Sequence, residues 1–239
     1  MRIFYEDKDL IAVEKPPGMD AQSVHSFAPD MVSEIRKHIH MLSTGGGEPY
    51  VGVIHRLDKP VGGVMVYAKN PKAAAALSRQ VQNHELRKIY AAAVCGKPVD
   101  NSGIFVDYLL KDPRENKSRI VDKGITGAKR AELRYRTVQT RLLEGEEVTL
   151  VQVELVSGRH HQIRVQFAGH GLPLWGDGRY HPAFGPGKRR GTLALWACGL
   201  AFRHPVSGEL LEFFSAPEGS VFPEFADAPL HKTLESGAY

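Results

Sequence analysis

Short strand-like segments, spread along the whole chain, constrain the fold of this sequence more than any other feature. Alternating or β-branched apolar residues predict strands near residues 3–5, 10–13, 51–54, 64–68, 89–95, 129–137, 148–156, 193–203 and 209–214. Helical spacing or helix-start signals mark three other segments, which lie at residues 31–42, 70–84 and 162–170. Because strands and helices do not alternate regularly, we expect an α+β fold rather than a doubly wound parallel sheet.

The chain is expected to form one continuous domain. Its 239 residues suffice for one large domain or two small ones, but the sequence shows no internal repeat, no heptad pattern and no separate linker. We therefore predict a single domain over residues 1–239. Its C-terminal segment, residues 216–239, has weak periodicity and is expected to pack loosely or to fray.

Positive charge is concentrated in two parts of the sequence. The whole chain carries a formal net charge of +4, whereas residues 111–141 alone contain ten Lys or Arg and only four acidic residues. A second basic cluster, Lys188-Arg189-Arg190, is framed by glycines. Either cluster alone is typical of a solvated face. Two of them favour a polyanionic partner, since each cation that binds a phosphate releases a counterion.

Metal, disulfide and membrane signals are weak in this sequence. Cys95 and Cys198 both lie in apolar runs, so we expect buried free thiols. No CxxC pair and no HExxH motif occurs, and we therefore expect no metal. A signal peptide and an apolar run of about 20 residues are also missing from the sequence. We expect a cytoplasmic monomer with no membrane partner.

The segment His55-Arg56-Leu57-Asp58 places an acid directly after an expected strand. Such a carboxylate can serve as a nucleophile or a general base. The following residues, Lys59-Pro60-Val61-Gly62-Gly63, are typical of a turn. On these residues alone, the better interpretation is that Asp58 caps that turn.

Two further segments combine polar residues with sheet-forming stretches. Tyr90 begins a strand, where a tyrosine usually packs half-buried but can instead stack on an RNA base. In Gly158-Arg159-His160-His161-Gln162-Ile163-Arg164, the side chains of His161, Gln162 and Arg164 can donate hydrogen bonds to a phosphate or a carboxylate. The planar fork of Arg164 suits a buried carboxylate that must stay ionised. Asp177, between two glycines, is interpreted as a turn former.

Taken together and in this order, these segments resemble the RluA-type pseudouridine synthase family. The similarity begins with Ile3–Asp7 and Lys15-Pro16-Pro17-Gly18, and continues through His55–Asp58, which matches the HRLD signature of the family. The stretches Lys88–Gly96, Gly158–Arg164 and Phe202–Glu209 match later motifs, so that the similarity spans roughly residues 2–215. We identify no N-terminal S4-like RNA-binding domain and expect a stand-alone catalytic domain.

The resemblance implies a fold, a reaction and a partner. The fold would be that of pseudouridine synthases, a mixed and mostly antiparallel central sheet flanked by helices and loops, with a basic RNA-binding cleft. The reaction would isomerise specific uridines in structured RNA to pseudouridine without a cofactor. Asp58 would attack the ribose C1′ or, alternatively, the uracil C6. The RNA would be large-subunit ribosomal RNA or transfer RNA, and we favour the former.

The resemblance also implies roles for individual residues. Arg164 matches the arginine that pairs with the nucleophile, and Tyr90 matches the tyrosine that stacks on the target base. Arg56 matches the arginine that fills the space left by the flipped uridine, which leaves its stack at a cost of a few kcal/mol. Ile163 matches an apolar residue near the base. His55, His161 and Gln162 are further candidates for RNA binding.

Two positions depart from the family pattern, and two other functions compete with the one implied. Val61-Gly62 stands where the family usually has Thr-Ser, and Trp196 stands in place of a histidine. A relative that binds RNA without catalysis is one alternative. A glycoside hydrolase is the other, but such enzymes need a second carboxylate near the first, and no acid accompanies Asp58 in its motif.

Overall fold

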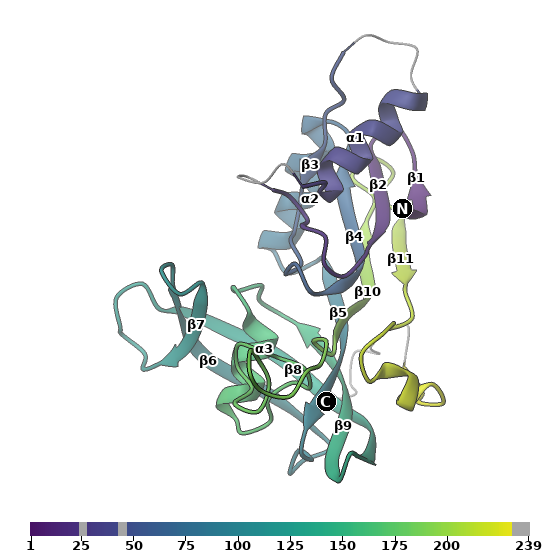
Figure 1. Cartoon of the computed structure of the whole chain (residues 1–239). Helices are drawn as coiled ribbons and strands as arrows, with labels where there is room; N and C mark the ends of the chain where they lie inside the picture. The colour runs from purple at the N-terminus through teal and green to yellow at the C-terminus, as the bar shows by residue number, and fades with distance from the viewer. Residues whose placement is uncertain (24–27, 43–46, 231–239) are drawn as a thin grey trace. The chain divides into compact units, whose positions relative to one another are not determined.

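The computed structural model describes residues 1–23, 28–42 and 47–230, and it divides into two compact units (Figure 1). The first unit comprises Met1–Arg87 and Ala197–Ala216, and the second comprises Lys88–Trp196 and Pro217–Tyr239. Each unit therefore contains segments that are far apart in the sequence. The expectation of a single domain stays a prediction.

The first unit is built on antiparallel strands. Strand β2 (Leu10–Lys15) pairs with both β1 (Arg2–Glu6) and β4 (Gly62–Ala68), and β4 also pairs with the short β3 (Gly52–Val53). Strand β10 (Leu195–Arg203) follows β4 in the strand order and pairs with β11 (Leu210–Phe214). Leu10, Val64, Val66 and Phe202 belong to its buried core.

Helices α1 and α2 belong to the first unit, and a local signal explains where α2 begins. Helix α1 spans Met31–Leu42, the predicted range, and buries Met31, Val32 and Ile35. Helix α2 spans Pro71–Gln82. The Asn70 side chain accepts a hydrogen bond from the Ala73 backbone N–H at 2.9 Å, and Pro71 occupies the first turn. The predicted helix start at Asn70-Pro71 is thus confirmed.

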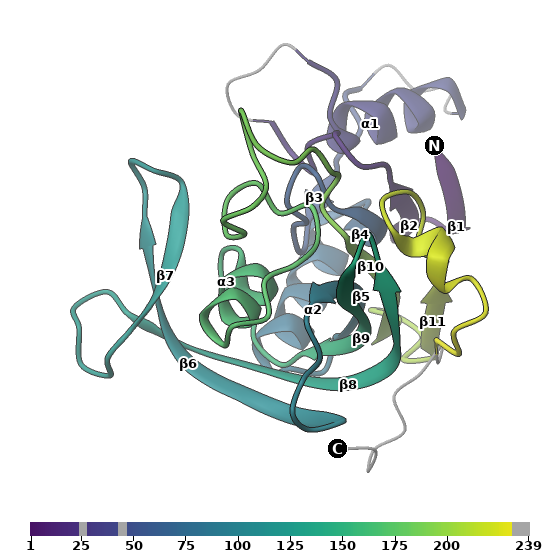
Figure 2. The same cartoon turned by 60° about the horizontal axis from the view of Figure 1, so that its bottom comes forward.

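The second unit contains a sheet in which every neighbouring pair of strands is antiparallel. Its order is β5 (Arg87–Cys95), β9 (Glu146–Leu155), β8 (Lys129–Leu143), β6 (Ser102–Asp112) and β7 (Lys117–Val121). Helix α3 (Gln162–Gly169) packs against this sheet, where Val165 contacts the buried Leu109 and Ala131. Figure 2 shows β6 and β8 as long, curved strands beside α3.

The expected α+β class is confirmed, and so is the mostly antiparallel character of the sheet.

The hairpin formed by β6 and β7 was not predicted, because charged residues between Lys111 and Lys123 interrupt the apolar alternation. In the C-terminal segment, Val221, Phe222 and Phe225 are buried, whereas residues 231–239 lie outside the described residues. The expectation of a loosely packed tail over residues 216–239 stays a prediction. Within the described residues, the helices are too short or too polar to cross a membrane.

Candidate active site

The loop between β3 and β4 carries His55, Arg56 and Asp58. The backbone carbonyl of Asp58 accepts a hydrogen bond from the Val61 N–H at 2.9 Å, which closes the expected turn, while the Asp58 side chain is half-buried. The Nε2 atom of His55 accepts a hydrogen bond from the Val66 N–H of β4 at 3.2 Å. The Arg56 side chain is exposed. His55 therefore anchors the loop to the sheet, whereas Arg56 faces solvent.

A buried lysine fixes the other end of this loop. The ammonium group of Lys15 donates to the carbonyl oxygens of Pro16 at 3.0 Å, Met19 at 2.7 Å and Lys59 at 3.1 Å. The Lys59 carbonyl also accepts a hydrogen bond from Gly18 at 2.8 Å. Lys15 thereby joins the segment that follows β2 to the residue next to Asp58. This role of Lys15 was not predicted from the sequence.

The charge of Lys15 is held in an unfavourable environment. Its side chain is fully buried, and burial lowers the pKa of the ammonium group to about 8, although the Asp20 and Asp58 carboxylates oppose this shift. A lysine in such a place must satisfy all three of its donors, and the three carbonyl oxygens do so.

The two departures from the family pattern both involve buried side chains. Val61 is 2% exposed and Trp196 is 2% exposed. The glycine that the family shares is required here for a geometric reason. Gly63 has a φ of +123°, and a Cβ atom at this position would collide with the backbone of Ala197. The unusual Val61-Gly62 thus leaves the constrained position, Gly63, unchanged.

Tyr90 lies on β5 in the second unit and is 6% exposed. In the register of the sheet it is opposite Val153, which in turn is opposite Tyr135 of β8. These three side chains therefore share one face of the sheet. The residues that follow Tyr90, Ala91–Val94, are completely buried, so the strand provides a rigid support for its ring.

The turn before α3 holds His161, Gln162 and Ile163 by internal contacts. His161 adopts a left-handed backbone conformation, with φ of 54°, and its Nδ1 atom lies 2.8 Å from the Tyr180 hydroxyl. The Gln162 side chain accepts hydrogen bonds from Ser157 and Arg159, and it donates to the Glu132 carbonyl. The side-chain amide of Gln162 therefore stabilises this turn through its hydrogen bonds. Ile163 is 3% exposed and faces the interior.

Arg164 forms a bidentate ion pair with Asp177. Its Nε and Nη2 atoms donate to the two carboxylate oxygens at 2.8 and 2.7 Å, and the two side chains are 5% and 0% exposed. The same carboxylate accepts hydrogen bonds from the backbone N–H groups of Arg179 and Tyr180. Burial raises the pKa of Asp177, but the hydrogen bonds and charge of Arg164 outweigh it, so the net pKa lies below the ordinary value.

Asp177 is the site residue whose role the sequence analysis missed. Its position between two glycines suggested a turn former, and it does accept the N–H groups of the turn. A buried arginine, however, requires a carboxylate partner, and the sequence offers Asp177 thirteen residues after Arg164. This requirement for a carboxylate partner could have identified Asp177 from the sequence.

The predicted site residues are thus distributed over both units. His55, Arg56 and Asp58 share one loop of the first unit, whereas Tyr90 and the residues His161–Arg164 belong to the second. Arg164 is paired with Asp177 within its own unit. The pairing of Arg164 with Asp58, which would join the two units, stays a prediction.

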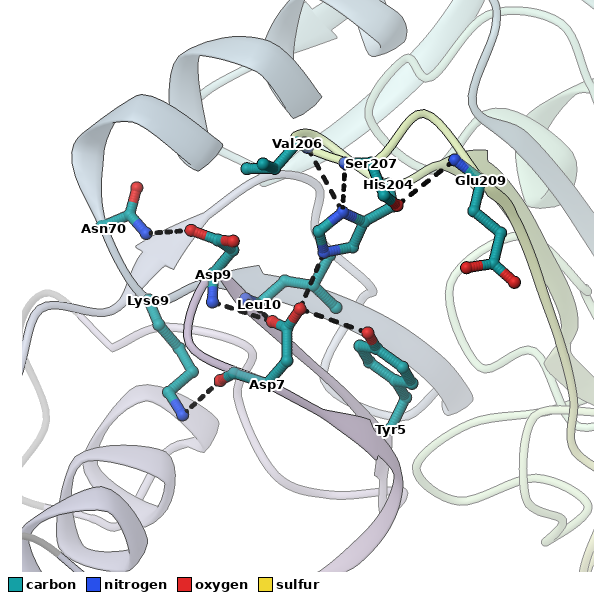
Figure 3. A network of polar contacts seen from close by, with 10 residues as sticks. All are labelled: Tyr5, Asp7, Asp9, Leu10, Lys69, Asn70, His204, Val206, Ser207 and Glu209. Carbon is teal, nitrogen blue, oxygen red and sulfur yellow. Dashed lines mark hydrogen bonds and ion pairs between the residues drawn. The ribbon is translucent and has the colours of Figure 1, made fainter.

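A network in the first unit superficially resembles a metal site. Asp7, Asp9 and His204 bring potential ligand atoms within 4.8 Å of one another (Figure 3). The Nδ1 atom of His204 accepts hydrogen bonds from the N–H groups of Val206 and Ser207, so in the neutral ring the proton resides on Nε2. That nitrogen lies 2.8 Å from the Asp7 carboxylate, to which it donates.

The two acids of this network are occupied as well. Asp7 accepts hydrogen bonds from the backbone N–H groups of Asp9 and Leu10, each at 2.8 Å. Burial raises the pKa of Asp7, but these N–H groups and His204 outweigh it and lower the net value. Asp9 accepts a hydrogen bond from the Asn70 side chain. The network therefore links the β1–β2 turn to the β10–β11 turn and to α2, with no ring nitrogen available to a cation.

Known proteins resemble this chain over most of its length. A family model described as RNA pseudouridylate synthase matches residues 9–169, a range that contains Asp58, Tyr90 and Arg164. An uncharacterized RNA pseudouridine synthase of Aquifex aeolicus is 34% identical over 220 residues, which cover 89% of this chain and 68% of that protein. Ribosomal large subunit pseudouridine synthase D of Zymomonas mobilis is 31% identical over 225 residues, with the same shares covered.

A solved structure supports the fold independently. The structure titled human RNA Pseudouridylate Synthase Domain Containing 1 superposes with a TM-score of 0.74, covering 98% of this chain and 90% of that chain. Its sequence identity is 22%, so the likeness concerns the fold.

Proposed function

This chain belongs to the RNA pseudouridylate synthase family and is an isomerase that acts on RNA, and we propose that it converts uridine to pseudouridine in large-subunit ribosomal RNA with Asp58 as its nucleophile. One observation carries the assignment of Asp58. Its loop, inside the matched range, is anchored by His55 at one end and by Lys15 at the other, with the carboxylate itself half-buried. A fixed backbone that presents a partly exposed carboxylate meets the needs of a nucleophile.

In the proposed reaction, a carboxylate oxygen of Asp58 attacks the ribose C1′ of a flipped uridine. The bond from C1′ to N1 breaks and its electron pair leaves with the uracil. The uracil then rotates, and its C5 attacks C1′ and displaces Asp58. Finally C5 loses its proton and N1 gains one, so that the product is an isomer of the substrate. Addition of Asp58 to the uracil C6 is the alternative first step.

Tyr90 is proposed to support the uracil ring. A base stacked on an aromatic side chain gains about 1–3 kcal/mol, which helps to offset the energy of leaving the RNA stack. The strand that carries Tyr90 is buried. Its backbone therefore holds the tyrosine ring in a fixed position beneath the uracil, as this role requires. We also propose Tyr90 as the group that assists removal of the C5 proton.

Arg164 is proposed to stabilise the ionised form of Asp58. Its pair with Asp177 uses Nε and Nη2, and the remaining nitrogen, Nη1, is not part of that pair. A guanidinium can hold two carboxylates through different nitrogens. Asp177 would then orient the guanidinium for Asp58.

We propose ribosomal RNA as the substrate because of the names of two relatives. The proteins of Zymomonas mobilis and Nitrosomonas europaea are both named ribosomal large subunit pseudouridine synthase D, and they are 31% identical to this chain. Transfer RNA is the alternative substrate. A cytoplasmic location is part of the same proposal.

The test uses RNA that carries tritium at C5 of uridine. Large-subunit ribosomal RNA fragments and transfer RNA are transcribed separately and incubated with wild type, Asp58→Asn and the control Asp100→Asn, which neutralises an exposed carboxylate. We expect wild type and the control to release tritium from ribosomal RNA, and Asp58→Asn to release none. If Asp58→Asn released as much tritium as wild type, the assignment of Asp58 as the nucleophile would be refuted. Release from transfer RNA alone would refute the substrate, and release from neither RNA would refute both.

A further inference from the structure

Strand β5 carries another buried lysine, Lys88, which is 9% exposed and lies two residues before Tyr90. Side chains two residues apart on a strand point to the same face, about 7 Å from each other. Lys88 therefore shares the face that carries Tyr90 and Tyr135, and the Tyr135 ring contacts Phe167 of α3. The lysine thus lies on the side of the sheet against which α3 packs, next to the tyrosine proposed to stack on the uracil.

The ammonium group of Lys88 reaches the turn that precedes α3. A Cβ atom placed on Gly158 would lie 3.4 Å from the Nζ atom of Lys88, so this nitrogen lies beside the Gly158 backbone. Gly158 and the following Arg159 are both exposed. An anion can therefore approach the Nζ atom from the surface of this turn, although most of the lysine side chain is buried.

Unlike the ammonium group of Lys15, that of Lys88 has no group that compensates its charge. Within the part of the chain that the structure describes, it forms neither a hydrogen bond nor an ion pair. Glu154 of the neighbouring strand β9 is opposite Ile89, so its carboxylate belongs to the other face of the sheet. The charge that acts on Lys88 is another cation. Burial lowers the pKa of the Lys88 ammonium group, and the Arg159 guanidinium lowers this pKa further.

This arrangement is unfavourable for the protein alone. A buried charge without a partner lowers the stability of the fold, and two neighbouring cations repel each other. An anion bound between Lys88 and Arg159 would remove both costs. A lysine ammonium group, with three donors on a compact charge, suits a phosphate oxygen.

We propose that Lys88, together with Arg159, binds a phosphate group of the nucleotide whose base stacks on Tyr90. This inference rests on the proposed function, which supplies the nucleotide. Lys88 and Tyr90 lie about 7 Å apart along one strand, a distance that a single nucleotide spans. The phosphate provides the counter-charge that Lys88 lacks, and the buried strand fixes the phosphate relative to the ring of Tyr90.

The experiment combines a substitution in the protein with a substitution in the RNA. Lys88→Met removes the ammonium group and keeps an apolar side chain. Lys97→Met is the matched control, because Lys97 is exposed and lies just beyond the other end of β5. The RNA is a ribosomal RNA fragment with ordinary phosphates, or with an uncharged methylphosphonate on the 5′ or the 3′ side of the uridine that wild type modifies.

Three measurements are made on each protein. Fluorescence anisotropy at several KCl concentrations gives the affinity for RNA and its dependence on salt. Tritium release gives kcat and KM. Thermal unfolding gives the melting temperature, which separates a contact with RNA from a contribution to the fold.

We expect Lys88→Met to bind the ordinary RNA at least about tenfold more weakly than wild type, because a charge-assisted contact is lost. KM should rise by a similar factor, while kcat at saturating RNA stays within about threefold. The slope of log affinity against log salt should be less negative by about 0.7–0.9, the contribution of one phosphate contact. The melting temperature should stay the same or rise, since a buried unpaired charge has been removed. Lys97→Met should behave like wild type.

The modified RNAs identify the phosphate. One of the two methylphosphonates should weaken binding to wild type by about tenfold. The same methylphosphonate should leave the affinity of Lys88→Met unchanged, because the contact is already absent in that variant.

Unchanged affinity and KM in Lys88→Met would overturn the proposal. A methylphosphonate effect of equal size in wild type and Lys88→Met would also overturn it, since Lys88 would then act through the fold alone. Wild type decides the question even if Lys88→Met fails to fold, because no loss of affinity for either methylphosphonate would contradict the proposed contact. A wild type that releases no tritium refutes the proposed function instead, while the affinity and salt slope of Lys88→Met still test the inference.

Discussion

The guanidinium of Arg164 and the carboxylate of Asp177 form a fully buried bidentate pair, with donor–acceptor distances of 2.8 and 2.7 Å. Neither charge is stable in the interior without the other. The pair therefore ties the start of α3 to the turn that contains Arg179 and Tyr180. It also determines in which direction the guanidinium presents its remaining nitrogen.

Replacing Asp177 by Asn is expected to lower the free energy of unfolding by roughly 3–5 kcal/mol, because it leaves a buried arginine without a counter-charge. Urea unfolding measures this loss. The control, Glu144→Gln, removes an exposed carboxylate that pairs with Arg189, and its effect should stay below about 1 kcal/mol. Similar effects of the two substitutions would show that the buried pair is not a major contribution to stability.

The Arg164–Asp177 pair also predicts how the free energy of unfolding depends on pH in the acidic range. The pKa of Asp177 is lower in the folded chain than its ordinary value, so the folded state favours the ionised form. Its contribution to stability is present above the unfolded pKa of about 3.9 and is lost as the pH falls through the folded pKa. The stability difference between wild type and Asp177→Asn should therefore shrink in acid. A difference independent of pH below 4 would contradict this explanation.

Lys15 predicts a second dependence of stability on pH, in the alkaline range. Its folded pKa of about 8 lies below the unfolded value of about 10.4, so the unfolded chain binds more protons between these values. The contribution of Lys15 to the free energy of unfolding should rise with pH across this window, by up to about 3 kcal/mol. Wild type compared with Lys15→Met between pH 7 and 10.5 measures it, with the exposed Lys72→Met as the control. The prediction fails if both variants follow the same curve.

Gly63→Ala is expected to destabilise the first unit by more than about 2 kcal/mol. Its positive φ is unfavourable for alanine, and the added Cβ would collide with the Ala197 backbone. Gly47→Ala is the control, since a Cβ atom there meets no neighbour within 4 Å. Thermal or urea unfolding of the two variants should therefore differ clearly. A stable Gly63→Ala protein would mean that β4 and β10 can separate at low cost.

The Asp7–His204 network is expected to stabilise the fold without a metal. His204→Phe keeps a ring but leaves the Asp7 carboxylate and two backbone N–H groups short of partners, which should cost about 2–3 kcal/mol. A double-mutant cycle with Asp7→Asn should give a coupling energy above about 1 kcal/mol. Neither zinc nor a chelator should shift the melting temperature of wild type. A clear rise with zinc would show that the network rearranges to bind it.

Local patterns in the sequence were sufficient for most of the secondary structure. Helix α1 has the predicted bounds, and α2 begins where Asn70 and Pro71 predict it, because caps and apolar spacing act within a few residues. The hairpin of β6 and β7 escaped prediction because it is held by contacts with distant residues rather than marked by its own apolar alternation. Leu109 packs with α3, and Ser118 contacts His160 in the turn before α3.

What the sequence by itself determined was the α+β class, the order of the motifs and, through resemblance, the candidate residues Asp58, Tyr90 and Arg164. Only the tertiary structure decided which groups hold them. Asp177 pairs with Arg164 across 13 residues, and Lys15 binds the Lys59 carbonyl next to Asp58 across 44. The physical reason is that a buried charge is satisfied by whichever partner folding brings near it. Spacing along the chain carries no record of that partner.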